Sequence, residues 1–140
     1  MSTQLASSPV AEAVLALLVA DQTLVDLAVG GIHDELPQDP PFPCVWCEYL
    51  TEIDRRGLGL GTLPEIALRV HVFSAYGGRR EGQAVLDRVI ALLKDAALAV
   101  TGWTQAGLVF YDSAVSLPAE ALDGVKVHEL VANFRIYVEA

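Results

Sequence analysis

The chain has 140 residues, of which 53% are hydrophobic and 19% are charged, a composition that excludes an intrinsically disordered protein. Its eighteen acidic and nine basic residues give a formal net charge of -9 at pH 7, which argues against binding to nucleic-acid phosphates. Because this length is typical of one domain, we expect a single globular domain over residues 1–140.

A first helix is expected over residues 9–18. Ser8 can accept a hydrogen bond from a free N–H at the helix start, and Pro9 loses nothing at the first helical position. Apolar side chains then recur with helical spacing at Val10, Val14, Leu17 and Leu18. This apolar run is too short to span a bilayer and contains Glu12, so we expect no contact with a membrane.

The next segment is expected to contain a short helix and then irregular chain. Asp21 is placed to cap a helix over residues 22–28, which ends at the glycine pair that follows. A brief extended segment over residues 32–34 precedes residues 36–43, which contain four prolines. Because proline removes a backbone donor, we expect residues 36–43 to form an ordered, extended loop.

The second half of the chain is expected to contain two hairpins with a long helix between them. Residues 44–53 and 66–74 have strand composition, and the glycine-rich connector between them predicts a long hairpin tip. A helix to about residue 99 follows, with an apolar stripe of Val85, Leu86, Val89, Ile90, Leu93 and Ala97. Two further strands are expected over residues 107–117 and 125–138, on either side of a turn.

This order of elements favours the α+β fold class. Short hairpin connectors cannot make the crossovers that a parallel sheet requires. We therefore expect an antiparallel (mixed) sheet of about four to five strands, with two main helices packed on one face.

The two cysteines of the chain, Cys44 and Cys47, form a CxxC motif. Such a pair can bind zinc or exchange thiols when it lies at a turn or a helix start. Here it lies on a predicted strand, where side chains three positions apart point to opposite faces. We interpret both residues as small buried hydrophobic groups.

The hairpin connector, residues 57–62 (GLGLGT), could suggest a nucleotide site. A phosphate-binding loop needs a helix directly after its glycines, whereas Pro64 and a strand follow here. We predict instead an interaction arm that contacts a partner protein. The candidate contact residues are Arg55, Arg56, Leu58, Leu60 and Leu63. The alternative is that these leucines fold back onto the protein's own core.

Arg79 and Arg80 are further candidates for contact with a partner. They open the long helix, where the helix dipole favours acidic residues, so a partner carboxylate could explain them. The alternative is a solvated, exposed pair.

No pattern in the sequence indicates catalysis. His33, Asp34 and Glu35 are adjacent, and three adjacent side chains cannot all face one ion without a special loop. The sequence also lacks the GxSxG, HExxH and phosphate-loop patterns. We therefore expect no enzyme activity and no catalytic, metal-binding or cofactor-binding residues.

Segments along nearly the whole chain resemble the tail-completion, or tail-terminator, proteins of long-tailed phages and gene-transfer particles. The resemblance lies in the order and spacing of residues 24–33 (LVDLAVGGIH), 42–46 (FPCVW), 67–74 (ALRVHVFS), 111–112 (YD) and 133–137 (NFRIY). It implies a structural virion protein that is assembled in the host cytoplasm and forms a ring, usually a hexamer.

The resemblance also implies partners. The ring would bind the last ring of the major tail tube protein, stop its growth, meet the head-tail connector proteins and let double-stranded DNA pass through its lumen. Contacts are expected at residues 36–43 and at residues 55–62. The alternatives are another neck component, such as a head-closure or connector-completion subunit, and a small ligand-binding or enzymatic domain that uses His33, Asp34 or the cysteine pair.

Overall fold

The computed structural model describes residues 5–55, 63–75, 79–122 and 125–139. Within these ranges the helices are α1 (Ser7–Val19), α2 (Gln22–Leu27) and α3 (Arg80–Leu93). The strands are β1 (Ile32–His33), β2 (Cys44–Asp54), β3 (Pro64–Ser74), β4 (Thr104–Gln105), β5 (Phe110–Leu122) and β6 (Val125–Glu139). The predicted order of helix, two strands, helix and two strands is confirmed.

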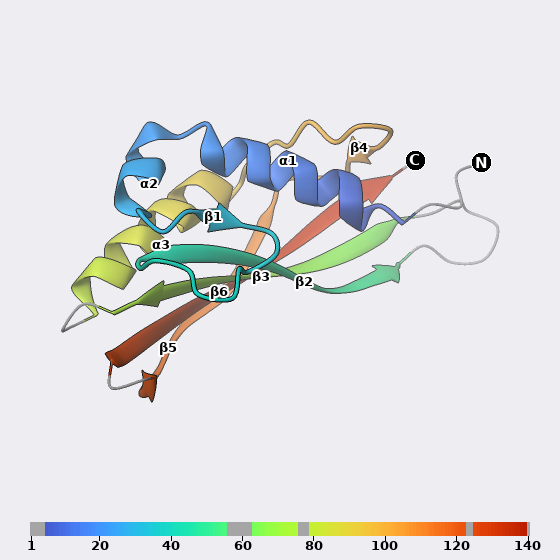
Figure 1. The fold of residues 1–140 in the computed structure, drawn as a ribbon. Helices are drawn as coiled ribbons and strands as arrows, with labels where there is room; N and C mark the ends of the chain where they lie inside the picture. The colour runs from blue at the N-terminus through green and yellow to red at the C-terminus, as the bar shows by residue number, and fades with distance from the viewer. Residues whose placement is uncertain (1–4, 56–62, 76–78, 123–124, 140) are drawn as a thin grey trace.

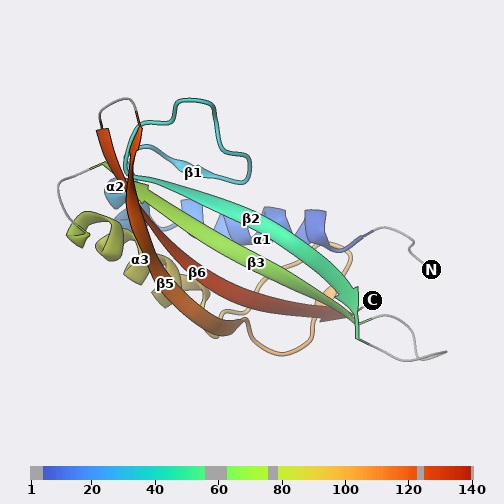
Figure 2. The same ribbon diagram turned by 90° about the horizontal axis from the view of Figure 1, so that it is seen from below.

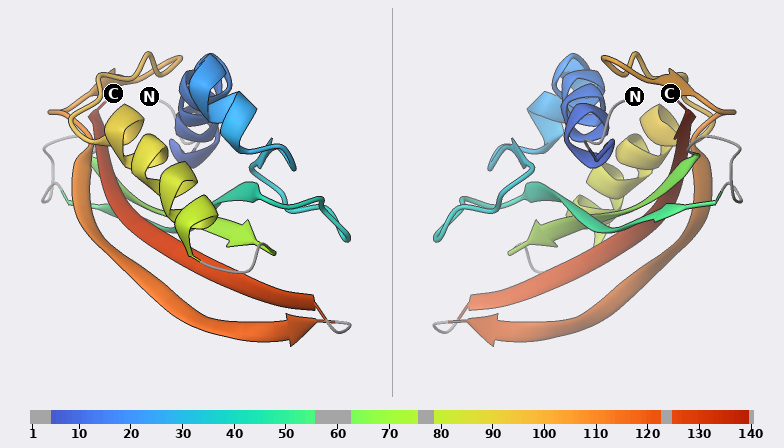
Figure 3. Two further views of the ribbon diagram at one scale, coloured as in Figure 1. Left: turned by 90° about the vertical axis from the view of Figure 1, so that its left-hand side faces the viewer. Right: turned by 90° about the vertical axis from the view of Figure 1, so that its right-hand side faces the viewer.

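The strands form one six-stranded sheet in the order β1-β2-β3-β6-β4, with β5 also paired to β6. β1 lies parallel to β2, and the other described pairs are antiparallel. The sheet curls, and the helices lie inside the curve (Figures 1 and 3). The α+β class is confirmed, but the expected four to five strands were too few. β4 was not predicted, because a strand of two residues is too short to show the alternation of apolar and polar side chains.

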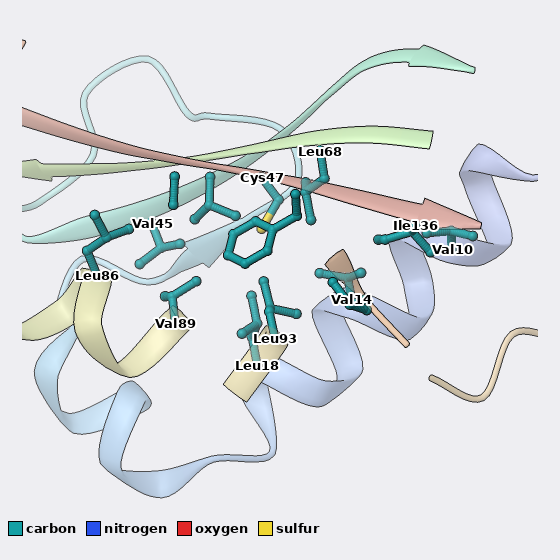
Figure 4. Close-up of a cluster of buried hydrophobic side chains, with 14 of the residues drawn as sticks. Val10, Val14, Leu18, Val45, Cys47, Leu68, Leu86, Val89, Leu93 and Ile136 are labelled. Carbon is teal, nitrogen blue, oxygen red and sulfur yellow. The ribbon is translucent and has the colours of Figure 1, made fainter. Parts of the chain in front are cut away.

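The buried core fills the space between the helices and the inner face of the sheet (Figure 4). The predicted stripe of α1 is buried at Val10, Val14 and Leu18, and that of α3 at Val85, Leu86, Val89 and Leu93. Alternate strand residues complete the core: Val45, Cys47, Ile66, Leu68, Val70, Val72, Leu130, Ala132, Phe134, Ile136 and Val138. None of the described helices is long and apolar enough to cross a membrane.

The start of α1 is capped from a distant strand, and the predicted Ser8 cap is wrong. The helix begins at Ser7, and its N-cap residue, Ala6, makes no side-chain cap. Instead, the Glu52 carboxylate accepts hydrogen bonds from the N–H groups of Ala6 (2.9 Å) and Ser7 (2.8 Å). A bulge between Tyr49 and Thr51 shifts the strand by one residue and so turns Glu52 toward the helix face.

The prediction that α3 extends to about residue 99 is wrong, since the helix ends at Leu93. Lys94 leaves the helical conformation with ψ 125°, and Asp95 takes a positive φ of 60°. The Asp95 N–H donates to the Val109 carbonyl at 3.0 Å. This contact with a later segment turns the chain away, although Ala97 continues the apolar period.

The predicted turn after residue 117 is also wrong, because β5 continues through Pro118 to Leu122. Proline cannot donate to a strand ladder, which normally restricts it to sheet edges and bulges. Both conditions hold here, since β5 pairs with β6 alone and the register shifts between Leu117 and Glu120. The β5–β6 hairpin is therefore longer than its sequence indicates.

Asp21 caps α2, as predicted, and also joins α2 to α3. Its carboxylate accepts from the Leu24 N–H at 2.8 Å and from Arg88 Nε and Nη2 at 2.8 and 2.6 Å. The hydrogen bonds from Arg88, aided by the Leu24 N–H and the Arg88 charge, lower the Asp21 pKa from 3.8 to about 2 against the opposing effect of burial.

This lowered pKa predicts a specific acid sensitivity. The native state holds Asp21 ionised more strongly than the unfolded chain does, so its contribution to stability is complete above about pH 4 and is lost as the pH falls toward 2. The stability difference between wild type and Asp21→Asn should therefore shrink between pH 4 and pH 2, as measured by urea unfolding. Asp26→Asn, on the same helix, is the control, and a constant difference for Asp21→Asn would contradict the assignment.

Candidate interaction surfaces

The outer face of the sheet carries no helix in the described part of the chain (Figure 2). Side chains that alternate with the core positions reach this face. They include Trp46, Glu48, Glu65, Arg69, His71, Phe73, Glu129, Asn133 and Arg135. The face is therefore a polar and aromatic surface open to solvent or to a partner.

His71 lies within this face and is only 8% exposed. Its Nε2 lies 2.8 Å from Glu48 Oε1, and its Nδ1 lies 2.6 Å from Glu129 Oε2. The ring stacks with Trp46 and Phe73 at centroid distances of 4.5 and 5.9 Å. Both ring nitrogens of His71 therefore lie within hydrogen-bond distance of a carboxylate oxygen. His71 thereby ties β3 to β2 and β6.

Replacing His71 by phenylalanine keeps an aromatic ring beside Trp46 but removes both ring nitrogens. Glu48 and Glu129 would then each lose a hydrogen-bond partner, and we expect the free energy of unfolding to fall by about 1–2 kcal/mol. His128→Phe on β6 is the control, with an expected change within about 0.5 kcal/mol. Equal changes in urea unfolding for the two variants would show that the His71 contacts do not stabilise the sheet.

Other polar pairs also cross the strands of this face. Arg69 Nε donates to Asn133 Oδ1 at 3.1 Å, and Asn133 Nδ2 donates to Ser113 Oγ at 3.2 Å. Arg135 lies 3.6 Å from both Glu65 Oε1 and Asp112 Oδ2. These contacts hold neighbouring strands together and bring no nucleophile to an activating base.

The cysteine pair does not form a site. Cys47 joins the core, whereas Cys44, three residues earlier on β2, lies on the opposite side of the strand. Both thiols are free and buried, and burial raises the pKa of Cys44 to about 11 and that of Cys47 to about 12. Since the thiolate is the reactive form, both cysteines are poor nucleophiles and poor metal ligands.

His33, Asp34 and Glu35, which follow α2, do not come together as a site either. His33 Nε2 lies 2.9 Å from the Gly30 carbonyl oxygen, which fixes the ring against the backbone. Asp34 and Glu35 are exposed. Among the described residues, no group of three or more His, Cys, Asp or Glu side chains could hold a metal ion.

The hairpin tip can be placed only at its two ends. Arg56, Leu58 and Leu60 lie outside the described residues. Arg55 donates to the Glu65 carboxylate and is therefore already paired within its own chain, although its side chain is 52% exposed. Leu63 is partly buried and closes the hairpin, since its carbonyl accepts from the Arg55 N–H at 2.9 Å.

Arg79 and Arg80 are both exposed at the start of α3. Among the ion pairs and hydrogen bonds of the described residues, none involves either side chain. Arg79 lines a groove of about 270 Å³ between α3 and β5, together with Leu86 and Ile90 of α3 and Ala114 of β5. Arg79 is thus a cation in the wall of a partly apolar groove, Arg80 is the next residue, and neither has an ion-pair partner among the described residues.

The edge strand β5 and the segment before it expose large apolar side chains that were not among the predicted contact residues. They are Leu108, Phe110, Val115 and Leu117, with exposed fractions of 55%, 52%, 50% and 37%. The sequence did contain an indication of this exposure, because apolar residues occur at both the odd-numbered and the even-numbered positions of this segment. A strand with one solvated face normally shows polar residues in one set.

A family model described as tail completion protein gp17 matches residues 12–139. No curated protein matches the sequence significantly. A chain from the virion of a native gene transfer agent particle has a similar fold, with a TM-score of 0.73 and 19% identity over 92% of this chain and 93% of that chain.

The gp17 protein of bacteriophage SPP1 is also similar in fold, with a TM-score of 0.58 and 21% identity over 94% of this chain and 91% of that chain. At such identities the two likenesses establish a shared fold. The family match, by contrast, rests on the sequence itself and extends from α1 to the end of β6. This chain therefore belongs to the tail completion protein gp17 family.

Proposed function

We propose that this tail-completion protein forms a ring, most simply a hexamer, that caps the tail tube. The observation that carries the proposal is the family match over residues 12–139. The ring would bind the last ring of major tail tube protein, end its polymerisation and present a surface to the head-tail connector proteins. This function places the protein in the tail of a phage or phage-like particle.

The surfaces of the chain support a structural role. Each subunit of a closed ring needs two different contact surfaces, and the structure offers an open sheet face, an apolar edge strand and a groove lined by Arg79. A net charge of -9 would also let DNA pass through a lumen without adhering to it. The proposed contact residues remain Arg55, Arg56, Leu58, Leu60, Leu63, Arg79 and Arg80.

Deleting the gene from its phage and imaging the particles tests this proposal. Loss of the cap should give tails of uncontrolled length that are not joined to heads, and a plasmid copy of the wild-type gene should restore normal particles. Normal particles without the gene would overturn the proposal. Unjoined tails of normal length would contradict the capping role and indicate another neck component.

A further inference from the structure

The β5 strand is a long sheet edge that exposes apolar side chains. Among the described strands it pairs only with β6, so one side of its backbone has unpaired N–H and C=O groups. Natural edge strands are commonly short or carry charges, prolines or bulges, because a long apolar edge pairs with other chains. β5 has Pro118 and two register shifts, but between the shifts it exposes Val115 and Leu117 and carries no charge, and Phe110 is exposed before the first shift.

The opposite edge of the sheet, strand β1, is in register with the middle of β5. One row of paired residues crosses the strands, from Ile32 of β1 through Val45, Val72 and Leu130 to Ser116 of β5. The short β1 strand and the most apolar part of β5 are therefore the two ends of one row.

The two ends carry opposite charge. The loop after β1, residues 34–43, contains Asp34, Glu35 and Asp39 and no basic residue, and all three acids are exposed. At the other end, two arginines outnumber the one acid of the groove, since Arg79 lines it with Asp87 and Val115 and Arg80 is the next residue. Four of the remaining basic residues, Arg55, Arg69, Arg88 and Arg135, are held by partners in their own chain.

We propose that neighbouring copies of this chain join head to tail, with the β5 edge and Arg79–Arg80 of one copy against β1 and the acidic loop 34–43 of the next. A second copy of the chain is the partner that fits, because every chain carries both the basic edge and the acidic edge, and the two edges are in register across the sheet. Such heterologous contacts close into a ring when the rotation between copies permits. This inference rests on the proposed ring and names the two surfaces that build it.

Disulfide cross-linking can detect this contact between copies inside assembled particles. We would place cysteines at Glu35 and Arg80, produce particles in cells that supply this variant, and run the purified particles on a non-reducing gel. Copies linked in a ladder of multimers are expected. The native cysteines should not interfere, because both are buried. A variant with cysteines at Glu12 and Arg80 is the control, since Glu12 is an exposed residue of α1, and it should remain monomeric.

Charge reversal provides a second, independent test of the same contact. Arg79→Glu with Arg80→Glu should reduce correctly capped particles on the order of tenfold, because like charges would meet at every contact. Adding Asp34→Arg and Glu35→Arg to the same chain should restore them. Circular dichroism checks that each variant folds.

The outcomes separate the two proposals. Particles that contain the cysteine variant without a ladder, or a quadruple variant no better than the double one, would overturn the edge-to-edge contact and leave the capping role intact. Wild-type particles that lack the chain altogether would overturn the proposed function, on which this inference rests.

Discussion

Replacing Phe134 with alanine is expected to lower the free energy of unfolding by about 3–5 kcal/mol. The side chain is 1% exposed in the middle of β6 and pairs in register with Leu68 of β3. Its ring also contacts that of Tyr111, at 5.6 Å between centroids. Truncation loses the transfer free energy of the ring and leaves a cavity between the sheet and α3. Urea unfolding followed by circular dichroism measures the change.

Phe110→Ala is the matched control, because it deletes the same ring from the neighbouring strand where the side chain is 52% exposed. We expect its free energy of unfolding to change by no more than about 0.5 kcal/mol. Comparable losses for the two variants would mean that Phe134 does not occupy the core as the fold requires.

Replacing Gly30 with alanine is expected to cost about 3 kcal/mol, at the upper end of the range for overpacking. An added Cβ would lie 1.8 Å from the Pro41 carbonyl oxygen and 2.9 Å from that of Pro43. Both are backbone atoms, which cannot rotate away as a side chain can. The Gly30 N–H also donates to the Pro43 carbonyl at 2.7 Å, so the substitution would displace the acidic loop.

Gly102→Ala is the control, because it introduces backbone strain without a steric clash. Gly102 has a φ of +83° but nothing within 4 Å of an added Cβ, so its cost is limited to about 1–2 kcal/mol of strain. Denaturant unfolding should rank Gly30→Ala as clearly worse. The reverse order would contradict the close packing of the loop against Gly30.

The helices and principal strands could be predicted because their patterns are local. The stripe of Val10, Val14 and Leu18 needs only helical spacing, and the alternation of Ile66 to Val72 needs only the period of a strand. The errors occurred where distant residues decide the structure. Glu52 replaces Ser8 as the cap of α1, and Val109 accepts the hydrogen bond that follows the end of α3.

The interaction surfaces were less predictable for the same reason. Arg79 and Arg80 could be named as candidates because their position opposes the helix dipole, which is a local property. The His71 contacts were not, since Glu48 and Glu129 lie 23 and 58 positions away in the sequence. That β5 is an edge strand follows from the strand order, which spacing alone does not determine.

The proposed role of this chain is to cap the tail tube as a ring. Electron cryo-microscopy of purified particles tests it most directly, because the fold of this chain can be fitted to the density at the head-proximal end of the tail. We predict one ring of copies between the last tube ring and the connector, with β5 of each copy beside β1 of the next. Density for the chain along the tube or at the distal tip, with none at the head-proximal end, would contradict the claim.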